Sequence, residues 1–439
     1  ESCGTSPQSS PSAEELPAYC SSLCKIVRRS DLQLLRYSSC WHRAMFSDLC
    51  RSRQRCITVI LGLSLVLEMV CSQHVPPVRV FWQGFGGEFC YRIPTVLRTS
   101  NGTLLAFAEQ RAKGCSDAAS KALVLRRSLD DGKTWGNMIV VVMSNAGQDL
   151  SNPNPVEVVL PAGRDDLSPR RAILLHYDTE NNPSPTRPGT NMQAWSHDDG
   201  LTWAGFQDIG EQLPASDQGC MPGPSVGVVA RDGTTYFSCH KGPGAFIYWS
   251  TDSGKTWQHS EVIPGVNECS IAMLSNGTSL AMNCRTFSKL RTQLTWDISD
   301  TRDIHVINRI DPAGLVDPGC QGSLIAAGEF LYLSNLHSTS GRVNIGVKRS
   351  SDNGLTWEDI SNSSFAFSGP SAYSQLVSWQ DVDEGQSPTG VVRSFGLLFE
   401  GGKKAVYESI SFATWADRSA VSQLPSPQIS GEDLQLIVV

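Results

Sequence analysis

The chain has 439 residues and a formal net charge of −7 at pH 7; 40% of its residues are hydrophobic and 18% are charged. This composition excludes a disordered chain, and the 11 Trp residues favour a globular protein rich in β-structure. Residues 76–439 hold 28 Lys and Arg against 37 Asp and Glu. An acidic domain argues against a nucleic-acid partner, so an anionic ligand would need a local cluster of basic side chains.

The most apolar stretch of the chain is residues 57–67, ITVILGLSLVL, which follows the basic stretch 51–55, RSRQR. The run is shorter than the roughly 20 residues that a membrane-spanning helix needs. A basic flank, a short apolar run and then small polar residues are typical of a signal peptide. We therefore predict an N-terminal extension over residues 1–75, with a signal peptide over 45–72 that begins at Met45.

This prediction implies that residues 1–44 are not part of the working protein and that the chain enters the secretory pathway, to be secreted or delivered to the lysosome. The alternative hypothesis is a genuine N-terminal extension with a signal anchor at residues 56–71, which we favour less than the signal peptide. Three Asn-x-Ser/Thr sequons, at Asn101, Asn276 and Asn362, agree with a secreted protein. Residues 419–439 read as a short, disordered tail.

Cysteine is unevenly distributed, with seven of the 14 residues in the first 75 positions. The remaining seven are widely spaced and contain no CxxC pair, so a zinc site is improbable. Because seven is an odd number, at least one of them stays unpaired within a monomer. Disulfides are expected in an oxidising compartment, but the spacing does not assign the pairs. The seven are Cys90, Cys115, Cys220, Cys239, Cys269, Cys284 and Cys320.

An eight-residue unit with the pattern S-x-D-x-G-x-T-W occurs four times, and five fixed positions cannot recur so often by chance. Each unit reads as a hairpin turn, because Asp can accept backbone N–H groups and Gly tolerates a positive φ. The units start 68, 54 and 100 residues apart, so the last gap fits two repeats. Residues 76–418 then hold six repeats, which predicts an all-β, six-bladed β-propeller. The units are residues 128–135, 196–203, 250–257 and 350–357.

These units are known as Asp boxes, and they resemble those of the sialidase superfamily. The resemblance is strengthened by residues 91–94, YRIP, and residues 105–111, LAFAEQR, which lie just ahead of the first box. Together they are similar to the R-I-P strand and the following strand of animal-type exo-α-sialidases. Asp boxes alone do not establish an enzyme, because propellers with such boxes also occur in binding proteins.

Sialic acid carries a carboxylate on its anomeric carbon, and guanidinium groups can hold a carboxylate by paired, charge-assisted hydrogen bonds. The family resemblance assigns this role to three arginines, Arg92, Arg285 and Arg342. It also implies that Arg111 touches the sugar and that Glu400 orients the first arginine.

The resemblance further implies a tyrosine nucleophile, which sialidases use in place of the usual carboxylate. A neutral phenol avoids repulsion by the substrate's carboxylate, but its pKa of about 10 requires a base. Tyr373, in GPSAYS, matches the nucleophile and Glu268, in NEC, matches its base. Asp117 matches the acid/base residue that serves the leaving group.

The expected activity is therefore a retaining exo-α-sialidase without metal or cofactor, acting on sialylated glycans and with no stable protein partner. Two alternatives stay open. One is another enzyme on the same site, a trans-sialidase or a hydrolase of deaminated sialic acid. The other is a non-catalytic lectin, for which the arginines alone would suffice.

Overall fold

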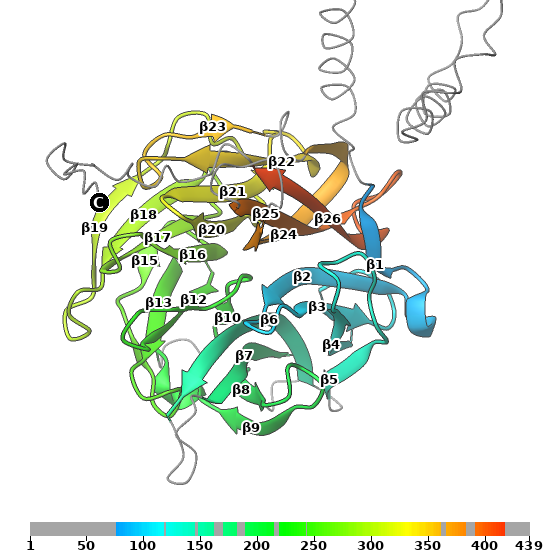
Figure 1. Ribbon diagram of the computed structural model, residues 1–439, viewed down its shortest axis with the longest axis horizontal. Coiled ribbons are helices and arrows are strands. Elements are labelled where there is room, and N and C mark those ends of the chain that lie inside the picture. Colours follow the sequence, from blue (N-terminus) through cyan, green and yellow to red (C-terminus); the bar gives the residue numbers. More distant parts are fainter. Residues whose placement is uncertain are drawn as a thin grey trace, which may run out of the picture. The chain divides into compact units, whose positions relative to one another are not determined.

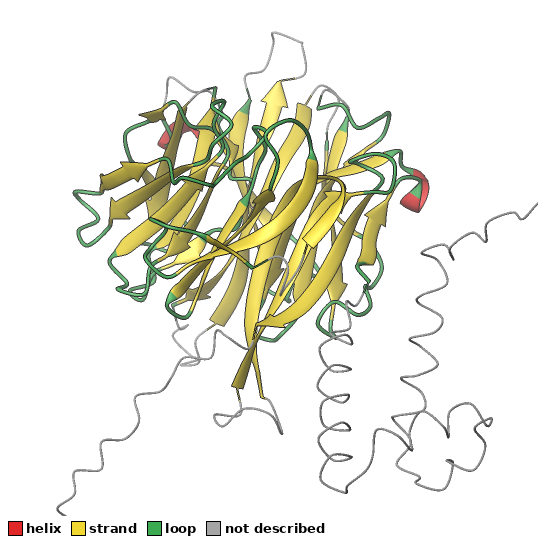
Figure 2. Ribbon diagram, turned by 90° about the horizontal axis from the view of Figure 1, so that it is seen from above, coloured by secondary structure: helices red, strands yellow, loops and turns green. Residues whose placement is uncertain are grey.

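The computed structural model describes residues 76–417 apart from 118–119, 145–147, 162–169, 182–188, 215–218, 243, 361–365 and 383–390. Within this part of the chain nearly every regular element is a β-strand, as Figures 1 and 2 show, and all strand pairs are antiparallel. The prediction of an all-β fold is confirmed for these residues. The expected signal peptide, the tail after residue 418 and the sequon at Asn362 lie outside the described residues.

The strands form sheets that succeed one another around a common centre (Figure 1). The first sheet holds β2 (Cys90–Arg98), β3 (Leu104–Arg111), β4 (Lys121–Ser128) and β5 (Ile139–Met143). The second holds β6 (Gln148–Leu160), β7 (Arg170–Asn181), β8 (Thr190–Ser196) and β9 (Ala204–Asp208). The third holds β10 (Met221–Pro222), β11 (Val228–Val229), β12 (Thr235–Lys241), β13 (Gly244–Ser250), β14 (Gln258–His259) and β15 (Ile263–Pro264).

The fourth sheet holds β16 (Cys269–Met273), β17 (Ser279–Cys284), β18 (Thr292–Asp297) and β19 (His305–Ile310). The last sheet is eight-stranded and contains two units. One unit is β20 (Ser323–Ala327), β21 (Phe330–Leu336), β22 (Val343–Ser350) and β23 (Glu358–Asp359). The other is β24 (Ala366–Val382), β25 (Val391–Gly401), β26 (Ser409–Asp417) and β1 (Val78–Trp82), so the first strand pairs with the last. Two short 3₁₀ helices complete the described elements, η1 (Phe85–Gly87) and η2 (Gly210–Gln212).

Strand β24 joins the two units of the large sheet. Its first residues pair with β22, up to Pro370 opposite Val343, and the rest, from Ser371, pairs with β25. Counted in this way the sheets form six units. β2 lies against both β6 and β24, which brings the first unit next to the sixth. The ring therefore closes by strand contacts within residues 76–417.

The hydrophobic core lies between neighbouring sheets. Leu105 and Phe107 of the first sheet, for example, form one buried cluster with Leu175 and Tyr177 of the second. Apolar side chains on both faces of the inner strands are needed for this packing, which explains the nearly continuous apolar sequence of β3 and β4. No helix among the described residues is both long and apolar enough to cross a membrane.

The Asp boxes form the turns between β4 and β5, β8 and β9, β13 and β14, and β22 and β23, and their hydrogen bonds repeat closely. In the second box Ser196 donates to Asp198 (2.9 Å), and the same carboxylate accepts both the amide of Thr202 (2.8 Å) and its hydroxyl (2.5 Å). The φ angle is 60° at Asp199 and 84° at Gly200, so the turn needs a left-handed backbone at two successive positions. The aspartate at the third position of each box thus holds its turn in the same way.

The tryptophan that ends each box packs at a seam between sheets. Trp203 contacts Phe107 of the first sheet edge to face, with ring centroids 5.8 Å apart. Trp135 contacts Phe412 of β26 in the same way at 5.4 Å. The boxes therefore stabilise the junctions between neighbouring sheets, as well as the hairpins themselves.

Successive turns of an antiparallel sheet alternate between its two ends. The Asp boxes and the exposed turns that contain Asn101 and Asn276 lie at one end. The start of each first strand, the end of each second strand and the start of each third strand lie at the other. Every candidate site residue belongs to this second group of positions, which we call the site end.

Candidate active site

Arg92 and Glu400 form the central ion pair of the site end. Arg92, in β2, donates to the two oxygens of Glu400, in β25, from Nε (3.0 Å) and Nη2 (3.3 Å), and the carboxylate is completely buried. Glu400 also accepts the backbone amides of Ile93 (2.9 Å) and Tyr373 (3.1 Å). Both amides sit at irregularities in their strands, and Ile93 has a φ of 57°, which a β-branched residue rarely adopts. Glu400 therefore fixes the Arg92 side chain and two neighbouring strands at once.

Arg111 has a similar support. At the end of β3 it donates to Glu109 from Nε (3.0 Å) and Nη2 (2.5 Å), and both side chains are almost fully buried. Glu109 in turn accepts the amide of Asn152 (3.0 Å), which lies at a bulge in β6 and has a φ of 53°. Glu109 was not predicted. Its position two residues before Arg111 in a strand, which places both on one face, was the available signal.

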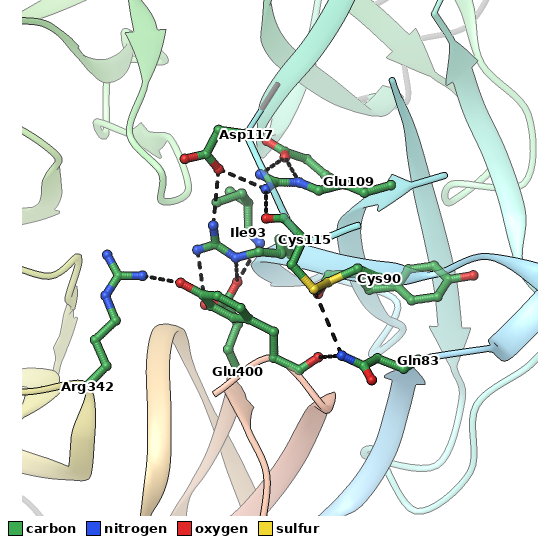
Figure 3. The surroundings of a disulfide bond; sticks show 12 residues. Gln83, Cys90, Ile93, Glu109, Cys115, Asp117, Arg342 and Glu400 are labelled. Carbon is green, nitrogen blue, oxygen red and sulfur yellow. Dashed lines mark hydrogen bonds and ion pairs between the residues drawn. A yellow bond between two sulfur atoms is a disulfide. The ribbon is translucent and has the colours of Figure 1, made fainter. Parts of the chain in front are cut away.

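Asp117 lies on the loop between β3 and β4, and 76% of its side chain is exposed. Its Oδ1 accepts Arg111 Nη1 (2.8 Å) and Arg92 Nη1 (3.1 Å). The loop is tied to the start of β2 by the Cys90–Cys115 disulfide, and the carbonyl of Cys115 accepts Arg111 Nη1 (2.6 Å). Figure 3 shows Asp117, Glu400 and Arg342 around this disulfide. The loop that carries Asp117 is thus anchored directly to the arginine cluster.

Tyr373, Glu268 and Arg285 form a second connected group. The hydroxyl of Tyr373 donates to Glu268 Oε1, and Arg285 Nη1 donates to Glu268 Oε2 (2.8 Å) and to the Tyr373 hydroxyl (3.4 Å). Glu268 precedes β16 and Arg285 follows β17, so the hairpin between these strands places them side by side. The Cys269–Cys284 disulfide joins the adjacent pair of residues. Glu268 and Tyr373 are both more than nine-tenths buried.

Arg342 approaches from the residue before β22. Its guanidinium carbon lies 5.5 Å from the centroid of the Tyr373 ring, and Nη1 donates to the hydroxyl of Tyr407 (2.5 Å). The ring of Tyr407 lies under Arg92, with the guanidinium carbon 4.1 Å from the centroid. Tyr407 was not predicted from the sequence, because no motif marks it.

The electrostatics of the group follow from burial and from these contacts. Burial raises the pKa of Tyr373 well above its ordinary value, and the Glu268 carboxylate adds to the effect. Partial burial would raise the pKa of Asp117, but Arg111 and Arg92 outweigh it and hold that pKa below its usual value. Burial opposes the charge of Arg92, yet the partner Glu400 raises the Arg92 pKa above normal. All the arginines here are permanent cations.

The structure brings all eight predicted residues into one network of contacts. It also pairs six of the seven cysteines at positions 90–320, as Cys90–Cys115, Cys220–Cys239 and Cys269–Cys284, and leaves a buried thiol at Cys320. The expectation of at least one unpaired cysteine is confirmed. Among the described residues no group of three or more His, Cys, Asp or Glu is placed to bind a metal. The eight are Arg92, Arg111, Asp117, Glu268, Arg285, Arg342, Tyr373 and Glu400.

The fold and site together define a β-propeller with Asp boxes and an arginine-lined site at one end. Residues 102–386 match the BNR repeat-like domain, and the chain belongs to this family. The chain is 28% identical over 339 residues to a sialidase of Bacteroides fragilis, covering 67% of this chain and 60% of that protein. It is 26% identical to Sialidase-2 of Mus musculus, and the match covers 76% of this chain and 94% of that protein. The resemblance to sialidases is confirmed.

Solved structures agree on the fold. A Hadza microbial sialidase, Hz136, superposes with a TM-score of 0.60 at 23% identity, covering 77% of this chain and 68% of that one. The intramolecular trans-sialidase from Ruminococcus gnavus superposes with a TM-score of 0.58 at 16% identity, covering 79% and 99%. At these identities the likeness concerns the fold alone. The chain also spans only 60% and 52% of the sialidases of B. fragilis and Micromonospora viridifaciens.

Proposed function

We propose that this protein is a retaining exo-α-sialidase, which removes terminal α-linked sialic acid from glycans through a covalent intermediate on Tyr373. The observation that carries the proposal is the buried hydrogen bond from the Tyr373 hydroxyl to Glu268, with Arg285 bonded to both side chains. A lectin that recognised the carboxylate would need only the arginines. A buried phenol bonded to a buried carboxylate supports nucleophilic catalysis.

Substrate would bind with its carboxylate among Arg92, Arg285 and Arg342. These arginines come from three different sheets, and Tyr373 lies close to all three guanidinium groups. A carboxylate held by several fixed guanidinium groups places the anomeric carbon that bears it near the Tyr373 oxygen. The clamp therefore supplies both affinity and the geometry of attack.

In the first step the Tyr373 oxygen attacks the anomeric carbon, and the bond to the leaving oxygen breaks. Glu268 accepts the phenolic proton, and Asp117 gives its proton to the leaving oxygen. The raised pKa of Tyr373 means that the phenol does not ionise on its own near neutral pH, so proton transfer to Glu268 must accompany the attack.

In the second step water attacks the same carbon and the bond to Tyr373 breaks. Asp117 takes a proton from the water, and Glu268 returns its proton to the tyrosine. Each step inverts the carbon, so the product keeps the original configuration. The cycle restores every residue and needs no cofactor.

The low pKa of Asp117 fits this scheme when the effect of substrate is considered. Arg92 and Arg111 stabilise the ionised form of Asp117. A bound carboxylate would compete for Arg92 and bring a second negative charge close to Asp117, and both effects raise the Asp117 pKa. Substrate binding would thereby favour the protonated acid that the first step needs.

A fluorinated sialyl donor, which forms the intermediate readily but releases it slowly, tests the proposal. We expect peptide mass spectrometry to find the sugar on the peptide that contains Tyr373, and Tyr373→Phe to remain unlabelled. Proton NMR of the first-formed product should show free sialic acid with retained configuration. A label on a carboxylate, or an inverted product, would refute the mechanism.

The same experiment separates the alternatives. A trans-sialidase would give a transferred or internally bonded sialic acid in place of the free sugar. A lectin would bind the donor without label or product. Natural sialosides of glycoprotein, ganglioside and oligosaccharide type should be compared, because the substrate class is also part of the proposal.

We further propose a route through the secretory pathway, to the outside or to the lysosome. Three disulfides within the described residues support an oxidising compartment. N-terminal sequencing of the mature protein expressed from Met45 tests this proposal. A first residue close to Ser72 is expected, and a mature terminus within residues 1–44 would contradict it.

A further inference from the structure

We infer that Tyr407 is a positioning residue for the carboxylate clamp, which holds Arg342 through its hydroxyl and Arg92 through its ring. This inference rests on the proposed function, because it assumes that the arginines bind a substrate carboxylate. It adds a role for a residue that neither a sequence motif nor the proposed chemistry of the reaction requires.

The argument starts from how each arginine is oriented. Arg92 is held by Glu400 and Arg285 by Glu268, and Arg111 outside the clamp is held by Glu109. Arg342 differs, because within the described part of the chain the structure records no carboxylate paired with it. Its polar contact is the Tyr407 hydroxyl, 2.5 Å from Nη1. Tyr407 thus takes the place that a glutamate has beside the other arginines.

A phenol orients a guanidinium group without neutralising it. Burial raises the pKa of Tyr407 and outweighs the opposing effect of Arg92, so the hydroxyl stays un-ionised at any physiological pH. Arg342 therefore keeps its full charge for a ligand. The face of the same ring lies 4.1 Å from the Arg92 guanidinium carbon, at the distance of a cation–π contact. One side chain consequently sets the relative positions of two clamp arginines.

The loop that carries Tyr407 is itself fixed in place. The Glu408 carboxylate accepts the amides of Lys403 (3.0 Å), Lys404 (2.8 Å) and Ala405 (2.8 Å), which closes the turn between β25 and β26. The side-chain amide of Gln83 donates to the backbone carbonyl of Tyr407 (3.2 Å), and the backbone N–H of Gln83 donates to the backbone carbonyl of Glu408 (3.1 Å). Because these contacts already fix the backbone around Tyr407, its side chain can position an arginine without a large further loss of conformational entropy in the loop.

Tyr407→Phe separates the two contacts, because it keeps the ring under Arg92 and removes only the hydroxyl from Arg342. We expect kcat/KM for a fluorogenic sialoside to fall roughly 10-fold or more, mainly through a higher KM, the size expected for a lost hydrogen bond to a charged group. Binding of an unsaturated sialic acid analogue, measured by calorimetry, should weaken by a similar factor. Tyr407→Ala should weaken analogue binding further, because Arg92 also loses its contact with the Tyr407 ring.

Tyr248→Phe is the matched control. It also removes one tyrosine hydroxyl: Tyr248 lies in β13 of the third sheet, and its hydroxyl is 2.8 Å from His176 Nδ1 of β7 in the second sheet, not from a clamp arginine. It should leave KM and analogue affinity unchanged. A lower melting temperature common to both variants would reflect lost stability, so all affinities are measured well below the lower melting temperature.

A double-mutant cycle shows whether Tyr407 acts through Arg342. In an Arg342→Ala background, Tyr407→Phe should change the analogue affinity less than twofold. An unchanged KM in the single variant, or fully additive losses in the cycle, would overturn the inference while wild-type sialoside cleavage left the proposed function intact. A wild-type protein that neither cleaves the sialoside nor binds the analogue would instead refute the proposed function, and the clamp with it.

Discussion

The backbone amide of Arg285 donates to the backbone carbonyl of Glu268 at 3.0 Å, so the backbone alone already places the candidate base opposite a clamp arginine. The next rung of the ladder is the Cys269–Cys284 pair, which is covalently closed. The side chains then add a second contact at 2.8 Å between Arg285 and Glu268. This arrangement ties the position of the base to that of the arginine.

Arg285→Lys should therefore damage two functions together. Lysine keeps the positive charge but cannot bond Glu268, Tyr373 and a substrate carboxylate from one planar group. We expect steady-state kinetics with a fluorogenic sialoside to show a fall in kcat/KM of roughly 100-fold. Arg302→Lys, at an exposed surface arginine, is the control and should have wild-type kinetics. Wild-type kinetics for Arg285→Lys would remove Arg285 from the site.

Asp117→Ala should reveal its role through the leaving group. Substrates with a good leaving group need little help from an acid, so their turnover should persist, whereas natural sialosides should be cleaved roughly 100-fold or more slowly. Rates for a series of aryl sialosides with increasing leaving-group pKa measure the effect. Equal losses across the series would show that Asp117 is not the acid.

Removing the Cys90–Cys115 disulfide should affect catalysis as well as stability. It closes a loop of 25 residues, so its loss should lower the free energy of unfolding by about 3 kcal/mol. Because the bridge anchors the Asp117 loop, the Cys90→Ala/Cys115→Ala variant should also show a steeper dependence on the leaving group. The matched control removes Cys220–Cys239, a 19-residue loop, and should lose stability with the leaving-group dependence unchanged. Identical kinetics for both variants would contradict the anchoring role.

The Asp boxes should matter for stability and not for turnover. Asp198→Ala removes three hydrogen bonds in the turn that follows β8, at the opposite end of the sheet from the site. It should lower the free energy of unfolding by about 1–2 kcal/mol, as measured by urea unfolding. We expect kcat/KM measured at 25 °C to match the wild type. A clear loss of turnover in the folded variant would give the boxes a role that the structure does not explain.

The same aspartates make stability depend on pH. Burial would raise the pKa of Asp198, Asp252 and Asp352, but hydrogen bonds together outweigh it and hold these pKa values, and that of Asp130, below the ordinary value of 3.8. As pH falls below about 4 the unfolded chain takes up protons that the folded chain does not. The stability that these groups supply is complete above that pH and is lost as pH falls through the lower, folded-state pKa. Urea unfolding between pH 2.5 and 5 should show this decline, and Asp198→Ala should have a shallower one.

The sequence was sufficient for features that lie within short stretches. An Asp box contains its own turn, its own acceptor and its own packing side chain, so eight residues define the structure that they adopt. Four boxes were enough to predict a ring of antiparallel sheets. Glu268 and Tyr373 were predicted through the family resemblance, and the structure places their side chains in contact.

Other features depend on contacts that no local pattern encodes. Tyr407 is 65 residues from Arg342 and 315 from Arg92; the eight-stranded sheet brings Tyr407 to Arg342, and the contact of the first unit with the sixth brings it to Arg92. The disulfide pairs have separations of 25, 19 and 15 residues, which the spacing could not distinguish from other pairings. The bulges at Ile93 and Asn152 also escaped prediction, because their positive φ angles are imposed by buried carboxylates from other strands.

The pairing of β1 with β26 has a consequence for how the molecule can be cut. The two end strands of the ring are neighbours, with Val78 opposite Phe412, so residues 78–417 form nearly a closed circle of chain. A circular permutant that joins these ends and opens an Asp-box turn would keep every sheet. A chain shortened past Gln83 would lose the outer strand of the last unit and also the grip of Gln83 on Tyr407. The residue that follows the outermost strand thus helps to fix the backbone of Tyr407, which contacts two arginines of the site.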